Sequence, residues 1–215
     1  MLKYNLSRFG AVRSASVSSA FNGHPTTPYS EAPESHADDE IYWECIKDFL
    51  HRVVPVAEEA GVRLALHPHH RGISRGTASG GIDAVLGSVD GLKRCIGLHA
   101  SPMHGIVFCQ GTISAMLVHP AEEIHDAMSW FGMRKRISIV HVRGLCGAEK
   151  LPETTPNARD IDIRATLQAC HAIGYEGMLI PDCVPVVQGD LDRYKAFAFS
   201  FGYLQALLQS TDGET

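Results

Sequence analysis

Four apolar runs in this chain of 215 residues each end on a side chain that can bind a divalent metal ion. The runs comprise residues 62–66, 105–108, 137–140 and 177–181, and the residues that follow them are His67, Cys109, His141 and Asp182. Short runs rich in β-branched and aliphatic residues are typical of parallel strands in a sheet that is covered on both faces. The pattern therefore predicts four buried parallel strands with polar residues at their carboxyl ends.

The spacing of these terminal residues fits a repeated strand–helix unit. Successive terminal residues are 42, 32 and 41 positions apart. A unit of a (β/α)8 barrel averages about 31 residues, from roughly 250 residues over eight units. The carboxyl ends of the strands share one face of such a barrel, and that face carries the active site. We therefore expect the four side chains to meet at one place.

Helical patterns separate the apolar runs. The first helix is predicted from about residue 37 to Gly61, on an amphipathic pattern formed by Ile41, Cys45, Phe49, Val53 and Val56. Further helices are predicted to begin near Ser88 or Asp90, over residues 120–131, from just after Asp162 through His171, and over about residues 190–208. A fifth strand is predicted over residues 1–6. Loops are predicted over residues 7–37, 70–84 and 144–158, with a turn of Gly, Ser and Thr after Cys109.

This alternation predicts an α/β fold with right-handed crossovers. We expect a partial (β/α) TIM barrel with about five parallel strands, in a single domain over residues 1–215. Residues 7–37 would form a long loop within it, and residues 210–215 a disordered tail. A closed barrel has eight strands, so the predicted barrel is incomplete.

Composition excludes several classes of function. The net charge of −5 gives no basic surface for nucleic acid, and no apolar stretch approaches the roughly 18 residues of a membrane-spanning helix. The six cysteines are scattered without close pairs, which argues against a disulfide framework or a compact zinc knuckle. We therefore expect a cytoplasmic protein that binds neither nucleic acid nor membrane.

The four terminal residues form a chemically sensible set of metal ligands. Two imidazoles, a thiolate and a carboxylate suit Mn²⁺, Fe²⁺, Co²⁺ or Zn²⁺ better than Ca²⁺ or Mg²⁺, which prefer oxygen ligands. Each residue alone also has an ordinary structural interpretation. A histidine at a strand end is commonly a hydrogen-bonded structural residue, a buried cysteine a small hydrophobe, and an aspartate after a strand a turn former. The joint pattern over four runs keeps the metal site open beside these alternatives.

Other polar residues near the strand ends are candidates for substrate binding. Arg143 lies two positions after His141, so both side chains face the same way on an extended strand. A guanidinium there can hold a substrate carboxylate in bidentate fashion, or it can be a solvated side chain. His69 and His70 either bind substrate or are exposed in a loop.

Asp160 and Asp162 precede a predicted helix. Either aspartate can cap that helix, which is the ordinary role of such a residue, or reach the site.

Several short segments together carry a resemblance to a known family. They are Leu64-Ala65-Leu66-His67-Pro68, Cys109-Gln110-Gly111-Thr112, His141-Val142-Arg143, Asp160-Ile161-Asp162 and Pro181-Asp182, with residues 49–62, 105–108 and 174–177 around them. In their order and spacing they resemble the mannonate dehydratase family, whose fold belongs to the xylose isomerase-like barrels. The resemblance spans nearly all of the chain.

This resemblance implies a site and a reaction. The family's metal, typically manganese, would be held at His67, Cys109, His141 and Asp182. The implied reaction is the dehydration of the small sugar acid D-mannonate to 2-keto-3-deoxy-D-gluconate, in hexuronate breakdown. Tyr194 matches a tyrosine in the family's catalytic region after the last strand, although it also fits an ordinary position at the start of an amphipathic helix.

The chain also departs from the family's pattern. Cys183 stands where the family has a histidine that is a candidate acid or base, and a cysteine of pKa about 8.5 suits that task less well. His69 and His70 replace two acidic residues, and Pro156 replaces a histidine. About three strands that the family has before the segment like residues 1–6 are absent. Either the sequence is a fragment, or a partner covers the open sheet edge, which makes a homo-oligomer plausible.

The sequence is compatible with three functions. The first is a metal-dependent sugar-acid dehydratase of the mannonate type, in which Arg143, His69 and Asp160 bind substrate and Tyr194, Cys183 and Arg143 serve catalysis. The second is a metal-dependent sugar isomerase or epimerase of the same barrel class. The third is a truncated relative without activity. Arg143 favours an acidic substrate, since a neutral sugar needs no partner for its guanidinium.

Overall fold

The computed structural model describes residues 39–69, 85–142, 144–145, 153–154, 162–182 and 184–212. The helices are α1 (Asp39–Ala60), α2 (Val89–Leu98), α3 (Gln110–Ser114), α4 (Pro120–Met133), α5 (Ile163–Ala172) and α6 (Tyr194–Asp212). The strands are β1 (Leu64–Leu66), β2 (His104–Cys109), β3 (Ile137–Val142), β4 (Gly144–Leu145), β5 (Glu153–Thr154) and β6 (Met178–Pro181). The predicted strand over residues 1–6 and the predicted loops over residues 7–37 and 70–84 lie outside the described residues.

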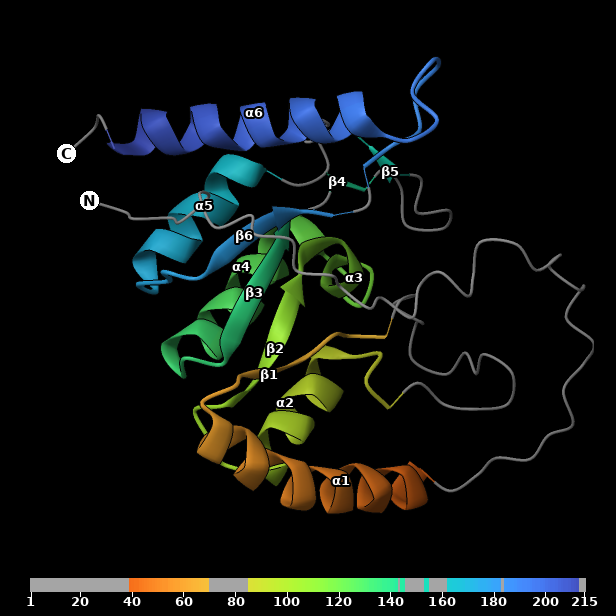
Figure 1. Cartoon of the computed structure of the whole chain (residues 1–215), viewed down its shortest axis with the longest axis vertical. Coiled ribbons are helices and arrows are strands. Elements are labelled where there is room, and N and C mark those ends of the chain that lie inside the picture. The colour runs from red at the N-terminus through yellow and green to blue at the C-terminus, as the bar shows by residue number, and fades with distance from the viewer. Residues whose placement is uncertain are drawn as a thin grey trace, which may run out of the picture.

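Four of the strands form one parallel sheet in the order β1-β2-β3-β6, as predicted from the four apolar runs. In Figure 1 the sheet crosses the middle of the molecule, with α1 beyond β1 at one end and α6 beyond β6 at the other. The register places Cys109 opposite His141, and Val142 opposite Pro181. The loop expected over residues 144–158 contains the small antiparallel pair of β4 and β5. The α/β class and the partial barrel are thus confirmed.

Burial differs from strand to strand. Every residue of β2 is buried, as expected for a strand covered on both faces. By contrast, all three residues of β1 are only partly buried, and β6 begins with the exposed side chain of Met178. Burial in β3 is mixed as well, since three of its six residues are only partly buried. Among the four strands of this sheet, the expectation of burial is therefore met along the whole length of β2 alone. It is wrong for β1 and for the start of β6. They are the two outer strands of the described sheet, so each has a strand neighbour on one side only.

Helix α1 confirms the predicted element but turns a different face inward. Its buried side chains are Trp43, Leu50, Val54 and Ala57. Most of the residues that defined the predicted stripe are instead exposed: Ile41 by 61%, Phe49 by 58% and Val56 by 62%, with Cys45 also exposed. Both sets recur at helical spacing, and Trp43 decides the orientation because its ring packs with Leu50, Val54 and Cys95.

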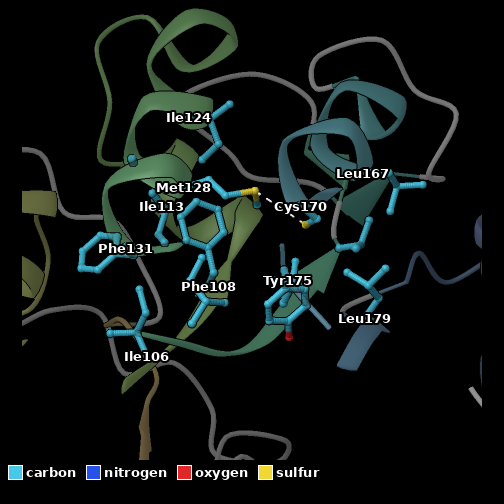
Figure 2. Close-up of a cluster of buried hydrophobic side chains, with 14 of the residues drawn as sticks. Ile106, Phe108, Ile113, Ile124, Met128, Phe131, Leu167, Cys170, Tyr175 and Leu179 are labelled. Carbon is cyan, nitrogen blue, oxygen red and sulfur yellow. Dashed lines mark hydrogen bonds between the residues drawn. The ribbon is translucent and has the colours of Figure 1, made fainter. Parts of the chain in front are cut away.

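The main core lies between the sheet and helices α4 and α5 (Figure 2). Phe108 of β2 and Phe131 of α4 are fully buried there. The Sγ of Cys170 lies 3.7 Å from the Sδ of Met128, which joins α5 to α4. Burial raises the pKa of Cys170 to about 12, so this thiol behaves as a small hydrophobe and not as a reactive group.

The helix ends follow local chemistry. Ser88 caps α2 through a hydrogen bond from the Gly91 N–H, and Asp162 caps α5 through bonds from Arg164 and Ala165. Gly174, with a φ of 63°, follows α5 in the left-handed region that favours glycine.

Two boundaries differ from those predicted. The turn expected after Cys109 is the short helix α3. Helix α6 begins at Tyr194 and not near residue 190, because the Asp190 carboxylate accepts bonds from the N–H groups of Lys195 (3.1 Å) and Ala196 (2.9 Å). The helix continues to Asp212, three residues into the expected tail. In the described part of the chain, none of the helices has both the length and the apolar character that a bilayer crossing needs.

Candidate metal centre

The four predicted ligands come together at the carboxyl edge of the parallel sheet. His67 follows β1, Cys109 is the last residue of β2, His141 lies near the end of β3, and Asp182 follows β6. One ligand atom from each residue lies within 4.8 Å of the others. The convergence expected from the strand ends is therefore present, although the four residues are up to 115 positions apart in the sequence.

The positions of the four side chains are fixed by the sheet. Cys109 and His141 are paired across β2 and β3. The N–H of Asp182 donates to the carbonyl of Val142 at 3.2 Å, which holds the carboxylate close to β3 after β6 has ended. The rings of His67 and His141 have centroids 5.5 Å apart. Cys109 is buried, His141 and Asp182 are half-buried, and His67 is exposed, so the centre opens on the β1 side.

The tautomer of His67 follows from its backbone contact. Its Nδ1 lies 2.6 Å from the carbonyl oxygen of Pro68. A carbonyl only accepts hydrogen bonds, so Nδ1 carries the proton and Nε2 of the neutral ring keeps its lone pair. Metal-binding histidines commonly bond a carbonyl in this way through the nitrogen that does not bind the metal.

The charges within the centre stabilise one another. Burial alone would raise the pKa of Cys109, but hydrogen bonds with His141, His67 and Thr112 lower it to about 6. Burial has the opposite effect on His141 and lowers its pKa, because the charged form of an imidazole is the protonated one. Hydrogen bonds with Asp182 and Cys109, together with their charges, outweigh burial and raise the pKa of His141 to about 9. Burial lowers the pKa of His67, but the hydrogen bond and the charge attraction with Cys109, together with the bond to the Pro68 carbonyl, outweigh burial and raise this pKa. The centre thus favours a thiolate beside protonated imidazole.

These residues fit a divalent transition metal ion. The thiolate, imidazole and carboxylate groups form a mixed donor set that suits Mn²⁺, Fe²⁺, Co²⁺ or Zn²⁺. The Nδ1 of His141 is buried and lies 3.5 Å from the Oδ2 of Asp182, a separation longer than that of a well-formed hydrogen bond. A cation at this place would replace the protons that now hold the thiolate and the carboxylate together.

Helix α3 holds two polar residues whose roles the sequence did not suggest. The hydroxyl of Thr112 lies 3.1 Å from the Sγ of Cys109, and the Nε2 of Gln110 donates to the hydroxyl of Thr166 at 2.8 Å. All four side chains are buried. The second bond ties the end of β2 to α5. A turn was predicted here, and the helix that forms instead places Thr112, three positions after Cys109, beside its sulfur.

Two of the remaining predicted site residues, His69 and Tyr194, are exposed. His69 is exposed, and its N–H lies 3.4 Å from the carbonyl of Leu86. Tyr194 is the first residue of α6 and is 76% exposed. Residues Arg143, Asp160 and Cys183 lie outside the described residues, as does His70. Their roles therefore stay predictions.

Known proteins resemble this chain over most of its length. The family model described as D-mannonate dehydratase (UxuA) matches residues 31–212. A mannonate dehydratase of Thermotoga petrophila is 32% identical over 162 residues, which are 74% of this chain and 43% of that protein. Mannonate dehydratase 2 of Halalkalibacterium halodurans is 29% identical and is matched over 72% of this chain and 44% of its own length. The chain thus spans less than half of the length of these relatives.

A solved structure shares the fold. The mannonate dehydratase of Streptococcus suis serotype 2 superposes with a TM-score of 0.69 at 24% sequence identity. The superposition covers 83% of this chain and 52% of that chain. At this identity the likeness establishes the fold alone, and it agrees with a partial barrel.

Proposed function

Since the chain belongs to the D-mannonate dehydratase (UxuA) family, we propose that it is a metal-dependent sugar-acid dehydratase. The proposed reaction converts D-mannonate to 2-keto-3-deoxy-D-gluconate and water, a step of hexuronate breakdown. The observation that carries this proposal is the convergence of His67, Cys109, His141 and Asp182, whose ligand atoms lie within 4.8 Å of one another. Arg143, two positions after His141, supports an acidic substrate over a neutral sugar.

These four residues would hold the metal ion, and we propose Mn²⁺, with Fe²⁺, Co²⁺ or Zn²⁺ as alternatives. When bound, such an ion supplies a Lewis acid that polarises the oxygens of a sugar acid and stabilises the negative charge that develops on deprotonation. The proton on Nδ1 of His67 and the buried environment of Cys109 favour a fixed arrangement of donors before any ion arrives.

The reaction needs two proton movements, which the chain's own residues would perform. A base removes the proton from the carbon next to the carboxylate, and an acid protonates the hydroxyl that departs from the next carbon as water. The resulting enol becomes the 2-keto acid. We propose Tyr194 and Cys183 for these proton transfers, with Arg143 beside them in catalysis. Arg143, His69 and Asp160 would bind the substrate. The family resemblance supports these assignments.

An assay of the purified 215-residue chain tests the proposal. The chain is freed of metal, supplied with Mn²⁺ and D-mannonate, and assayed for a 2-keto acid. We expect product from the wild type. We expect loss of both product and bound metal in His141→Ala and Asp182→Asn. Asp126→Asn is the matched control, because Asp126 is exposed on α4.

Two results would count against the proposal. Unchanged metal content in both ligand variants would refute the metal site. Stoichiometric metal without any 2-keto acid would leave a metal-binding protein that does not dehydrate mannonate.

We also propose that the chain acts in the cytoplasm, on the basis of its scattered cysteines, of which Cys45, Cys95, Cys109 and Cys170 are free thiols. A homo-oligomer stays a prediction. Light scattering on the purified chain would measure its mass in solution.

A further inference from the structure

Cys109 occupies a helix-capping position without using its side chain as a cap. It is the last residue of β2 and the residue directly before α3. Side chains at this position usually accept a hydrogen bond from a backbone N–H in the first turn of the helix. Cys109 makes no such bond. Its sulfur is therefore available to the other side chains of the centre.

The hydroxyl of Thr112 takes the place of that backbone donor. It lies 3.1 Å from the Sγ of Cys109, and the two residues are 2% and 0% exposed. A thiolate has no proton to give, so in the form that binds metal the sulfur accepts and the Thr112 hydroxyl donates.

Other buried hydroxyls of the described helices behave differently. Ser114, Thr166 and Ser200 each donate to the carbonyl four residues earlier, at 2.6, 3.2 and 2.8 Å. That bond is the ordinary one for serine and threonine inside a helix. The contact of Thr112 with a metal-ligating type of side chain is therefore specific to its place beside the candidate metal centre.

We propose that Thr112 is a positioning residue that aims the Cys109 thiolate at the metal ion. This inference rests on the metal site proposed above. A cysteine side chain has three staggered rotamers, and a fixed donor on one side favours one of them. Thr112 is a suitable donor because it is buried, its χ1 is restricted by β-branching, and α3 follows Cys109 without an intervening loop.

The proposal predicts two linked effects on the metal. Loss of an outer partner of a ligand typically costs 10- to 100-fold in metal affinity, so we expect at least about a tenfold loss when the hydroxyl is removed. The thiolate also becomes a better electron donor without its hydrogen bond. In the Co²⁺-loaded protein, the thiolate-to-cobalt charge-transfer band should therefore move to lower energy.

Cobalt titration of the full chain tests these effects without measuring activity. Thr112→Val removes the hydroxyl at nearly constant shape, and Thr112→Ser keeps it. We expect Thr112→Val to bind Co²⁺ at least about tenfold more weakly with a shifted band, and Thr112→Ser to retain most of both wild-type properties. Ser200→Ala is the control, because it removes a buried hydroxyl of α6 that bonds only its own helix. Circular dichroism checks that each variant is folded.

Three outcomes would overturn the inference. The first is a folded Thr112→Val with wild-type affinity and band position. The second is a folded Thr112→Ser that binds Co²⁺ at least about tenfold more weakly than the wild type, and this result remains decisive if Thr112→Val does not fold. The third is a wild type without any thiolate-to-cobalt band, which refutes the metal site as well. The first two leave the proposed function intact, so the failures are distinguishable.

Discussion

Cys109 and His141 have opposite pKa shifts, and their effects on the pH dependence of stability nearly cancel. The pKa of Cys109 falls from 9.0 to about 6, so its contribution is present above pH 9 and is lost as the pH falls through about 6. The pKa of His141 rises from 6.5 to about 9, so its contribution is present below pH 6.5 and is lost as the pH rises through about 9. Between these limits the folded pair carries one proton on His141 and the unfolded pair one on Cys109.

This balance predicts how one substitution changes the pH dependence of stability. In the metal-free wild type the pair should add almost no slope between about pH 6.5 and pH 9. Cys109→Ser removes the opposing titration and leaves His141 paired with Asp182. We therefore expect the variant to lose stability, relative to the wild type, as the pH rises across this range. Urea unfolding at several pH values measures the free energy of unfolding of both proteins. Parallel curves of this free energy against pH would contradict the expectation.

At the scale of elements, the sequence predicted the positions of strands better than the faces of helices. The four strands could be predicted because each apolar run stops at a polar residue, such as His67 or Asp182. The inward face of α1 could not, since Phe49 and Leu50 belong to two apolar patterns of nearly equal strength. Only the partners in the fold, here α2 and the side of β1, decide between them.

The orientation of α1 gives the adjacent residues Phe49 and Leu50 very different degrees of burial. Phe49 is 58% exposed and Leu50 is 5% exposed. We expect Leu50→Ala to lower the free energy of unfolding by about 2–5 kcal/mol, because it leaves a cavity. Phe49→Ala should change it by only about 0.5 kcal/mol, as for an ordinary surface substitution. Chemical denaturation measures the free energy of unfolding of both variants. A larger decrease for Phe49→Ala than for Leu50→Ala would mean that the predicted face of α1, and not the observed one, is turned inward.

Two glycines of α2 provide a second matched pair. A Cβ on Gly91 would overlap with the carbonyl oxygen of Val85, whereas a Cβ on Gly97 would meet nothing within 4 Å. Gly97→Ala should therefore stabilise the helix by up to about 1 kcal/mol through helix propensity. Gly91→Ala should destabilise it, because backbone must move to make room. Thermal melts of both variants check the opposite signs, and equal shifts would show that the approach of residue 85 to α2 is not tight.

The four ligand residues of the site could be predicted from the sequence, but the side chains that contact them could not. Strand ends indicate which backbones meet, so His67, Cys109, His141 and Asp182 were found together. The bond from Thr112 to Cys109 depends on a helix of five residues, whose pattern of Gly, Ser and Thr is typical of a turn. All five residues of that helix are buried, so its formation depends on contacts that a local pattern does not contain.

At the scale of the whole molecule, the candidate centre joins every strand of the parallel sheet. One donor comes from or directly follows each of β1, β2, β3 and β6. An ion bound there would stabilise the folded chain only, by about 2.7 kcal/mol at a concentration 100 times the dissociation constant. We expect Mn²⁺ to raise the melting temperature and a chelator to lower it, with no response in Asp182→Asn. An identical melting temperature with and without metal would contradict this.

The pairing of Cys109 with His141 across neighbouring parallel strands also bears on the time course of folding. Parallel neighbours need a crossover between them, and the donors are accordingly 42, 32 and 41 residues apart in sequence. Such non-local contacts form slowly, because chain ends must find each other before any contact compensates for the lost entropy. During synthesis Asp182 leaves the ribosome last of the four. A fully coordinated ion would therefore mark a chain in which all three parallel pairings are already made.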